Sequence, residues 1–383
     1  MIGADLVPLR HVARLVYGDS LPTESRGEGQ VPVYGSNGQT GMHSDANTLG
    51  PVVVVGRKGS QGKVQYSPVP VFAIDTTYFI DSRYTRADIR WLYYALSVLD
   101  LPSMTQDVGV PGLARENAYS LRVSLPRSVA AQRTIADYLD TETARIDTLI
   151  DRRRSILALL AERRRHASDA VIDQMSEGSW PQEKLKHVVD GFVDTLHATA
   201  PEADDGPGYI VGTPSIRDGS LDLSLARRCS IETLREWTRR AAPRAGDVLV
   251  TREAPAGEAA LVPQDVPLAP GQRVVLIRTN PSRLLPPLVV AAVYSGRARR
   301  FFDQLSHETT VRHLNMADIG ELPVVVPPEQ LQVSVAQAIS SRLDAVDCLT
   351  RAMSTQIGLL LERRQALITA AITGQLEIPG LAA

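Results

Sequence analysis

Two glycine-rich loops near the start of the chain carry side chains suited to holding nucleic acid. The first, GRKGSQGK at 56–63, presents five polar side chains: Arg57, Lys58, Ser60, Gln61 and Lys63. Cations and backbone amides on a glycine turn suit DNA phosphates. The second, YGSNGQTG at 34–41, adds Asn37 and Gln39, whose amides offer the donor and acceptor that an adenine edge requires. Each loop taken alone is also typical of a hairpin turn.

The first loop does not match a nucleotide-binding P-loop. It has five residues between Gly56 and Gly62, where that motif has four. Val64 also stands where a Ser or Thr would bind magnesium. The loop therefore gives no support to an ATPase.

A second set of polar residues lies in the second half of the chain, in TPSIRDG (213–219), Arg252-Glu253 and HETTVRH (307–313). Its candidate DNA contacts are Thr213, Ser215, Arg217, Arg252, Glu253, Thr309, Thr310 and Arg312. These residue types differ from those of the first set, as expected if two parts of the chain read different base sequences. Arg297, Arg299 and Arg300 suit either a phosphate grip or a solvated helix end.

No catalytic motif accompanies these loops. A DNA adenine methyltransferase needs an Asn-Pro-Pro-aromatic motif, and Asn280-Pro281-Ser282 does not supply it. A restriction nuclease needs clustered acidic metal ligands with a lysine, and no Pro-Asp motif is followed by Glu-x-Lys. Cys229 and Cys348 stand alone, which excludes a disulfide framework and a cysteine zinc site. We therefore expect a binding protein that is not an enzyme and has no metal or cofactor of its own.

Length and composition predict a cytoplasmic protein of two or more domains. The 383 residues are 44% hydrophobic and 22% charged, as in ordinary globular proteins. The apolar runs at 50–56 and 322–328 are far shorter than the roughly 20 residues of a membrane span, and the start does not resemble a signal peptide. The net charge of −2 means that DNA binding must depend on local basic patches or on partner subunits.

One long helical pattern occurs twice, at 143–174 and at 344–375, with a constant offset of 200 residues between Asp147 and Asp347 and between Arg164 and Arg364. Shorter echoes connect 9–12 with 185–188, 51–68 with 246–263, and 113–129 with 314–330. We expect strands at 51–56, 70–74 and 119–125, a short helix at 128–140 before the first long one, and another around 329–341 before the second. The Gly-Ser-Trp-Pro sequence at 178–181 should end the first long helix.

The repeat divides the chain into a first head (1–126), a first helical region (127–178), a second head (179–328), a second helical region (329–378) and a tail (379–383). The heads are rich in predicted strands, so the fold class is α+β. Both long helices carry an apolar seven-residue pattern, whose main members are Ile146, Ile150, Leu157, Leu160, Val346, Ile357, Leu360 and Leu367. Matching stripes predict an antiparallel coiled coil; packing of each helix on its own head is the alternative. The arginines at 152–154 and 163–165 should face solvent or a partner.

The order of these elements resembles the DNA-specificity subunit of type I restriction-modification systems. The resemblance covers essentially the whole chain. It depends on Pro126 followed by Gln132, Ile135, Ala136, Leu139 and Asp140, on Ile-Asp-x-Leu-Ile at 146–150, and on RRQALITAAITGQ at 363–375. The second copy of the Gln-Ile-Ala element departs from the pattern, with Gln332, Val335 and Ala336.

The resemblance implies that the two heads are target-recognition domains, each reading half of a bipartite site in double-stranded DNA. It implies docking of two methyltransferase subunits, which bind S-adenosylmethionine and methylate adenine at N6, and of restriction endonuclease subunits that use ATP and Mg. About 32 helical residues span on the order of 48 Å, or roughly one to one and a half turns of DNA at about 34 Å per turn. The alternative is a coiled-coil adaptor whose β-rich heads bind proteins.

Overall fold

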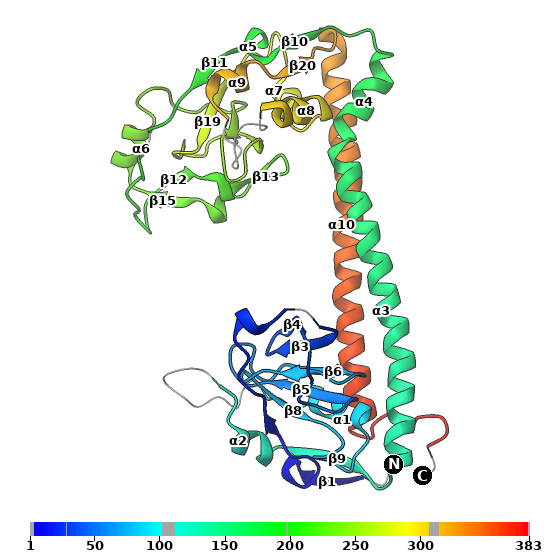
Figure 1. Ribbon diagram of the computed structural model, residues 1–383. Helices are drawn as coiled ribbons and strands as arrows, with labels where there is room; N and C mark the ends of the chain where they lie inside the picture. The colour runs from blue at the N-terminus through cyan, green and yellow to red at the C-terminus, as the bar shows by residue number, and fades with distance from the viewer. Residues whose placement is uncertain (1–3, 28, 102–111, 197, 306–313, 382–383) are drawn as a thin grey trace. The chain divides into compact units, whose positions relative to one another are not determined.

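The computed structural model describes residues 4–27, 29–101, 112–196, 198–305 and 314–381. The chain is an α+β protein with two compact units (Figure 1). The first unit contains Met1–Arg154 and Thr355–Ala383, and the second contains Ser155–Ser354. Each unit therefore combines one head with parts of both long helices.

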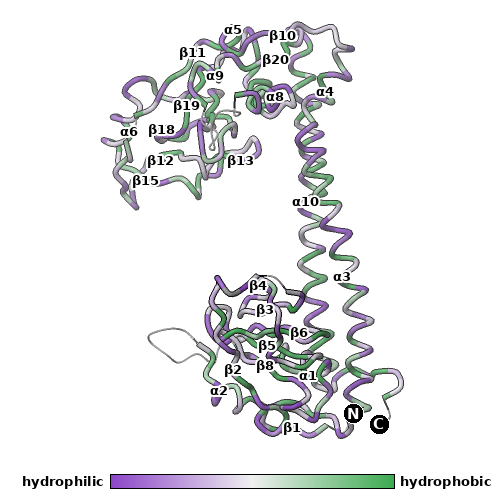
Figure 2. Tube along the Cα trace, viewed as in Figure 1, coloured by the Kyte–Doolittle hydropathy of each residue, from purple (hydrophilic) through white to green (hydrophobic). Residues whose placement is uncertain are grey.

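The first head has a four-stranded antiparallel sheet in the order β2 (Val16–Tyr17), β8 (Thr77–Ile80), β5 (Val52–Gly56) and β6 (Val64–Ser67). A three-stranded sheet has the order β4 (Gly38–His43), β3 (Val31–Gly35) and β7 (Phe72–Ala73), with β3 and β7 parallel. The four valines of β5 are fully buried, which explains why this strand is a continuous apolar run (Figure 2). The predicted strand at 51–56 is thus confirmed.

The other elements of the first head are β1 (Ala4–Pro8), which pairs with β9 (Arg122–Pro126), and the helices α1 (Ile89–Ser97) and α2 (Arg115–Ser120). The strand predicted at 119–125 is wrong at its start, because residues 119–120 close α2 instead. The strand predicted at 70–74 is shorter than expected, since only Phe72–Ala73 pairs in the sheet.

The second head repeats this topology. Its four-stranded sheet has the order β11 (Val189–Val193), β19 (Val274–Thr279), β16 (Val248–Thr251) and β17 (Ala259–Leu261). Its three-stranded sheet has the order β15 (Arg227–Cys229), β12 (Gly208–Val211) and β18 (Leu268–Pro270), again with one parallel pair. β10 (Gln182–Lys184) pairs with β20 (Pro323–Val325), as β1 does with β9. The internal repeat therefore holds in strand order as well as in sequence.

The second head also includes the β13–β14 pair (Ile216–Arg217, Ser220–Leu221) and the α-helices α5 (Leu185–Val188), α6 (Ile231–Trp237), α7 (Pro286–Val293), α8 (Gly296–Leu305) and α9 (Met316–Gly320). The matching segments 9–12 and 185–188 make equivalent backbone hydrogen bonds. The amide of Leu9 donates to the carbonyl of Leu121, and that of Leu185 donates to the carbonyl of Leu322, both at 2.8 Å.

The long helices are α3 (Val129–Arg165), α4 (Ala167–Ser176) and α10 (Glu329–Ile372). The short helices predicted at 128–140 and 329–341 are not separate, because neither copy has a proline or glycine to interrupt the helix before 147 or 347. The first long helix is interrupted at His166 instead. Asp169 of α4 accepts from the Gly296 amide and pairs with Arg297, which ties α4 to the second head.

α3 and α10 are antiparallel. In the first unit Asp147 pairs with Arg364 and Arg153 with Gln356, so the partner position recedes as α3 advances. Hydrophilic and hydrophobic residues alternate along both helices (Figure 2), and their apolar stripes form the antiparallel coiled coil expected from the sequence. α4 ends at Ser176, followed by left-handed Glu177 and Gly178, as the Gly-Ser-Trp-Pro sequence predicts.

Candidate nucleic-acid interface

The two polar loops of the first head lie together. Lys63 Nζ donates to the backbone oxygen and to Oδ1 of Asn37, both at 2.8 Å. Gln65 Nε2 donates to the carbonyls of Gly35 (3.1 Å) and Ser36 (3.3 Å). The β3–β4 and β5–β6 turns therefore form one polar edge, although 26 residues separate Asn37 from Lys63.

The cations of this edge differ in their freedom. The Arg57 guanidinium donates to the carbonyl of Asp75 at 3.2 Å and lies 5.0 Å from the centre of the Tyr17 ring. Lys58 and Lys63 are exposed, as are Asn37 and Gln39, while Ser60 and Gln61 are half-buried. Exposed lysines beside exposed amides give this edge both phosphate-binding and base-reading chemistry.

The second head has the same hairpin with different residues. The amide of Gly56 donates to the carbonyl of Lys63, and the amide of Thr251 to that of Glu258, both at 2.8 Å. The amides of Gly62 and Gly257 then close the two turns in the same way, each at positive φ. By this register Glu258 is the counterpart of Lys63, so equivalent places carry opposite charges.

Two of the eight predicted contacts of the second head, Arg252 and Glu253, are engaged within the chain. Arg252 donates through Nε to the carbonyl of Leu314 at 2.9 Å and pairs with Asp194 at 3.3 Å, with only 12% of its side chain exposed. Glu253 pairs with Arg273 at 3.2 Å.

Two further predicted contacts are turned inward. Thr213 and Ser215 are buried, so they are poorly placed to touch DNA, whereas Arg217 is exposed. Thr309, Thr310 and Arg312 lie outside the described residues.

The sequence analysis did not identify Glu258 and Tyr294 of the second head as site residues. Glu258 accepts from the backbone amide of Asp218 at 2.9 Å and from the Tyr294 hydroxyl at 2.8 Å. Burial raises the pKa of Tyr294, and the neighbouring Glu258 raises it further. This network joins the β13–β14 turn to the β16–β17 turn, as Lys63 and Asn37 join the turns of the first head. The alignment of 246–263 with 51–68 contained the signal.

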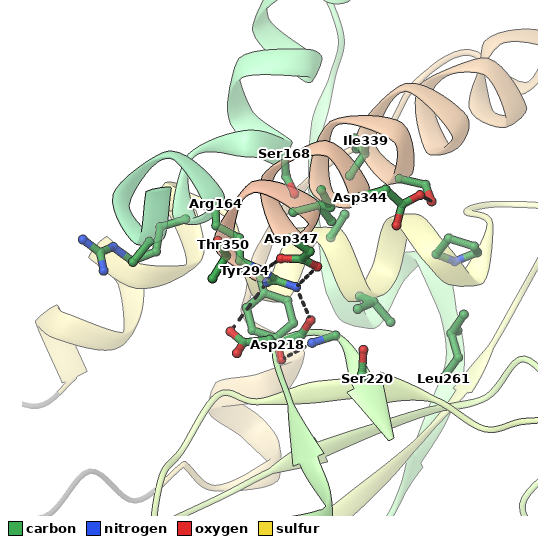
Figure 3. Close-up of a pocket in the computed structure, with 18 of the residues that line it drawn as sticks. Arg164, Ser168, Asp218, Ser220, Leu261, Tyr294, Ile339, Asp344, Asp347 and Thr350 are labelled. Atoms are coloured by element: carbon green, nitrogen blue, oxygen red, sulfur yellow. Dashed lines mark hydrogen bonds and ion pairs between the residues drawn. The ribbon is translucent and has the colours of Figure 1, made fainter. Parts of the chain in front are cut away.

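The helix seam has a repeated ion pair. Arg164 Nε lies 2.8 Å from Asp347 Oδ1 in the second unit, and Arg364 Nε lies 2.9 Å from Asp147 Oδ1 in the first. Both partners are shifted by 200 residues, so the two pairs are counterparts. Arg164 also donates to the carbonyl of Asp218 at 2.8 Å (Figure 3). Burial alone would lower the pKa of Arg164, but the hydrogen bond to Asp347 and the charge of Asp218 raise it.

The predicted seam residues follow the same stripe. Ile146, Ile150, Leu160 and Val346 are buried, and Leu157, Ile357, Leu360 and Leu367 are half-buried. Leu159, which faces away from the stripe, is 64% exposed.

The glutamine of the Gln-Ile-Ala element has a defined structural task. Gln132 Oε1 accepts from the amide of Asp88, which caps α1, at 2.8 Å, and Gln332 Oε1 accepts from the amide of Leu285, which caps α7, also at 2.8 Å. Their Nε2 groups donate to the carbonyls of Pro126 (3.4 Å) and Pro327 (3.2 Å). We call each set of glutamine hydrogen bonds a clamp. The second copy keeps its clamp despite the altered residues near Gln332.

Arg297 holds α4 instead of standing free, since it contacts Asp169 and Asp173, each at 2.8 Å. A role for Arg297 in binding DNA phosphates is therefore disfavoured. The described residues contain no group of three or more His, Cys, Asp or Glu that could hold a metal ion. No helix in the described part of the chain is long and apolar enough to cross a membrane.

Comparison with known proteins identifies this architecture. Residues 4–157 match the family described as type I restriction modification DNA specificity domain. The chain therefore resembles the specificity subunits of type I restriction-modification systems. It is 20% identical over 349 residues to the type I restriction enzyme EcoBI specificity subunit of Escherichia coli, which covers 85% of this chain and 73% of that relative.

A solved chain from a study of complex assembly and conformational transition of the type I restriction-modification system has the same fold. The TM-score is 0.66 at 15% identity, with 98% of both chains covered. The S subunit from Thermoanaerobacter tengcongensis also matches, at 16% identity over 98% of this chain and 97% of that one, with a TM-score of 0.46.

Proposed function

We propose that this chain is a type I restriction-modification specificity subunit that reads a bipartite DNA site, with one half-site recognised by each head. The observation that carries the proposal is the pair of equivalent hairpins, which share backbone geometry but have Lys63 in one head and Glu258 in the other. A common frame with divergent polar turns suits two different sequences, because base readout depends on the side chains that enter the groove. We assign target recognition to residues 1–126 and 179–328.

In the first head we assign phosphate contacts to Arg57, Lys58 and Lys63, and base contacts to Asn37 and Gln39, with Ser60 and Gln61 lining the turn. In the second head Arg217 and Glu258 are the exposed and half-buried polar groups near the corresponding turns. Thr309, Thr310 and Arg312 remain candidates from the sequence. Lysines grip phosphates without regard to sequence, whereas amide and carboxylate groups discriminate between base edges.

We assign partner docking to the helical regions 127–178 and 329–378. Leu149 and Leu349, at equivalent positions, are 38% and 49% exposed, and Leu159 and Leu359 are 64% and 59% exposed. Leu149 and Leu359 belong to the first unit, and Leu159 and Leu349 belong to the second. Large apolar residues exposed at equivalent positions of both units are compatible with a protein partner, and the repeat favours two copies of the same one.

The proposed partners are two methyltransferase subunits, which use S-adenosylmethionine to methylate adenine at N6, and restriction endonuclease subunits that use ATP and Mg. All catalysis belongs to these subunits, and the assembly works in the cytoplasm. The chain itself supplies sequence recognition and the frame on which the enzymes assemble.

Co-purification tests this proposal. The full chain, expressed with its cognate methyltransferase subunit, should form a complex that binds one DNA sequence over unrelated duplexes. If the heads instead bind other proteins, and the chain neither binds a methyltransferase nor selects a DNA sequence, the coiled-coil adaptor is favoured. Metal-dependent DNA cleavage by the isolated chain would favour an autonomous nuclease.

A further inference from the structure

The second unit contains an open cavity of about 700 Å³ where its helices meet its head (Figure 3). α7, α10 and the strand β17 contribute its apolar wall through Leu261, Val290, Ala291 and Leu343. Arg164 and Tyr294 also line it. Its lining belongs wholly to Ser155–Ser354, so the cavity lies within this unit.

The first unit fills the corresponding space with its own side chains. The Arg90 guanidinium carbon lies 4.3, 4.9 and 5.0 Å from the ring centres of Tyr66, Tyr93 and Tyr94. Arg90 also pairs with Asp140 at 2.6 Å, and the Tyr94 hydroxyl donates to the same carboxylate at 2.6 Å. Burial, aided by that hydrogen bond, raises the pKa of Tyr94 to about 12.

The correspondence between the two sites follows from hydrogen bonds. The Gln132 and Gln332 clamps hold the caps of α1 and α7, which sets the register between the two helices. The strand pairs Val53–Tyr66 and Val248–Leu261 set the register of β6 and β17. The counterparts of Tyr66, Arg90, Tyr93, Tyr94 and Asp140 are then Leu261, Pro287, Val290, Ala291 and Ser340, and all five line the cavity.

We propose that the cavity receives an aromatic side chain, accompanied by a basic group, from the methyltransferase subunit docked on the second unit. The inference rests on the proposed function and deepens it, since it makes the cavity a socket for a side chain of the partner at one of the two docking sites. The first unit needs no such group because its socket is already occupied. The two methyltransferase subunits are therefore held differently.

The chemistry of the occupant follows from what the cavity lacks and what its edge offers. Its apolar wall can bury a ring in the place of the first unit's tyrosines. Asp344 at the edge is exposed and forms no ion pair with any residue in the described part of the chain, so it can take the place of Asp140 in holding a cation. Thr350 and Ser354 continue the lining along α10.

The test fills the cavity with the first unit's own residue. Val290→Tyr places a ring at the counterpart of Tyr93, and Leu261→Tyr does the same at the counterpart of Tyr66. Binding of the cognate methyltransferase subunit to the full chain is measured by titration, with stoichiometry from native mass spectrometry. The wild type should bind two subunits, and either variant should bind one of them at least about tenfold more weakly. Asp344→Lys should weaken the same site.

Ser282→Tyr adds the same ring at an exposed position of the second head and should bind as the wild type does. The filled variants should unfold at or above the wild-type temperature, so weaker binding would not reflect misfolding. If both filled variants bind two methyltransferase subunits with the wild-type affinities, the proposal is wrong. It is also wrong if a small aromatic cation such as benzamidine stabilises the chain but leaves methyltransferase binding unchanged. If the wild type binds no methyltransferase at all, the proposed function fails first.

Discussion

Loss of the Gln332 clamp should destabilise the second unit. The side chain is 4% exposed and satisfies three backbone groups: the Leu285 amide and the carbonyls of Arg283 and Pro327. Gln332→Leu keeps the size but leaves these groups without a partner. A buried polar group left unpaired costs about 1–3 kcal/mol, so with partial access to water we expect a loss of about 2–4 kcal/mol in the free energy of unfolding.

Urea denaturation and hydrogen exchange over α7 are the assays. Exchange should accelerate at the start of α7, where the Leu285 amide is released, while α1 stays protected. Gln330→Leu, at an exposed glutamine two residues earlier on the same helix, should change stability by less than about 0.5 kcal/mol. Gln132→Leu should reproduce the loss in the first unit. Equal stability of Gln332→Leu and Gln330→Leu would refute the clamp.

Three further predictions concern the DNA edge, the seam and acid stability. Alanine at Arg57, Lys58 and Lys63 should weaken DNA binding by the assembled complex and reduce its salt slope by about one unit per lost phosphate contact; an unchanged slope would exclude this phosphate grip. Leu160→Asp should abolish soluble protein, because it buries an unpaired charge, whereas Leu159→Asp should leave a folded chain with weaker methyltransferase docking. Burial opposes ionisation of Asp81, but hydrogen bonds from Arg83 and the Leu49 amide outweigh it and lower its pKa. Its stabilisation is therefore present above the unfolded-state pKa and lost as pH falls through the lower folded value, so Asp81→Asn should be less stable than the wild type at neutral pH and converge with it in acid.

The repeat made the long helices predictable from the sequence, whereas the strand order of the heads became known only from the fold. Asp147 and Asp347, with Arg164 and Arg364, recur at a fixed offset because the same ion pair closes both seams. The interruption at His166 was harder to predict, because no proline or glycine marks it in the sequence.

The binding surfaces were only partly predictable. Lys63 and Asn37 were identified as separate loops, and only the fold brings them together. Arg252 and Ser215 had suitable residue types, but the fold uses the first in an internal ion pair and buries the second. The cavity could not be predicted from the sequence. It arises because the second unit has smaller residues than the first at equivalent positions, and this equivalence became known only from the hydrogen bonds of the fold.

Bipartite recognition can be tested by mapping methylated adenines in cells that carry this chain with its methyltransferase. We expect two short half-sites separated by a fixed run of unread bases. Inserting seven residues beside Arg153 and seven beside Gln356 keeps the seam in register and adds about 10 Å, so the gap should grow by about three base pairs while both half-sites stay the same. A continuous wild-type site, or a gap that does not move, would contradict the two-headed reading of DNA.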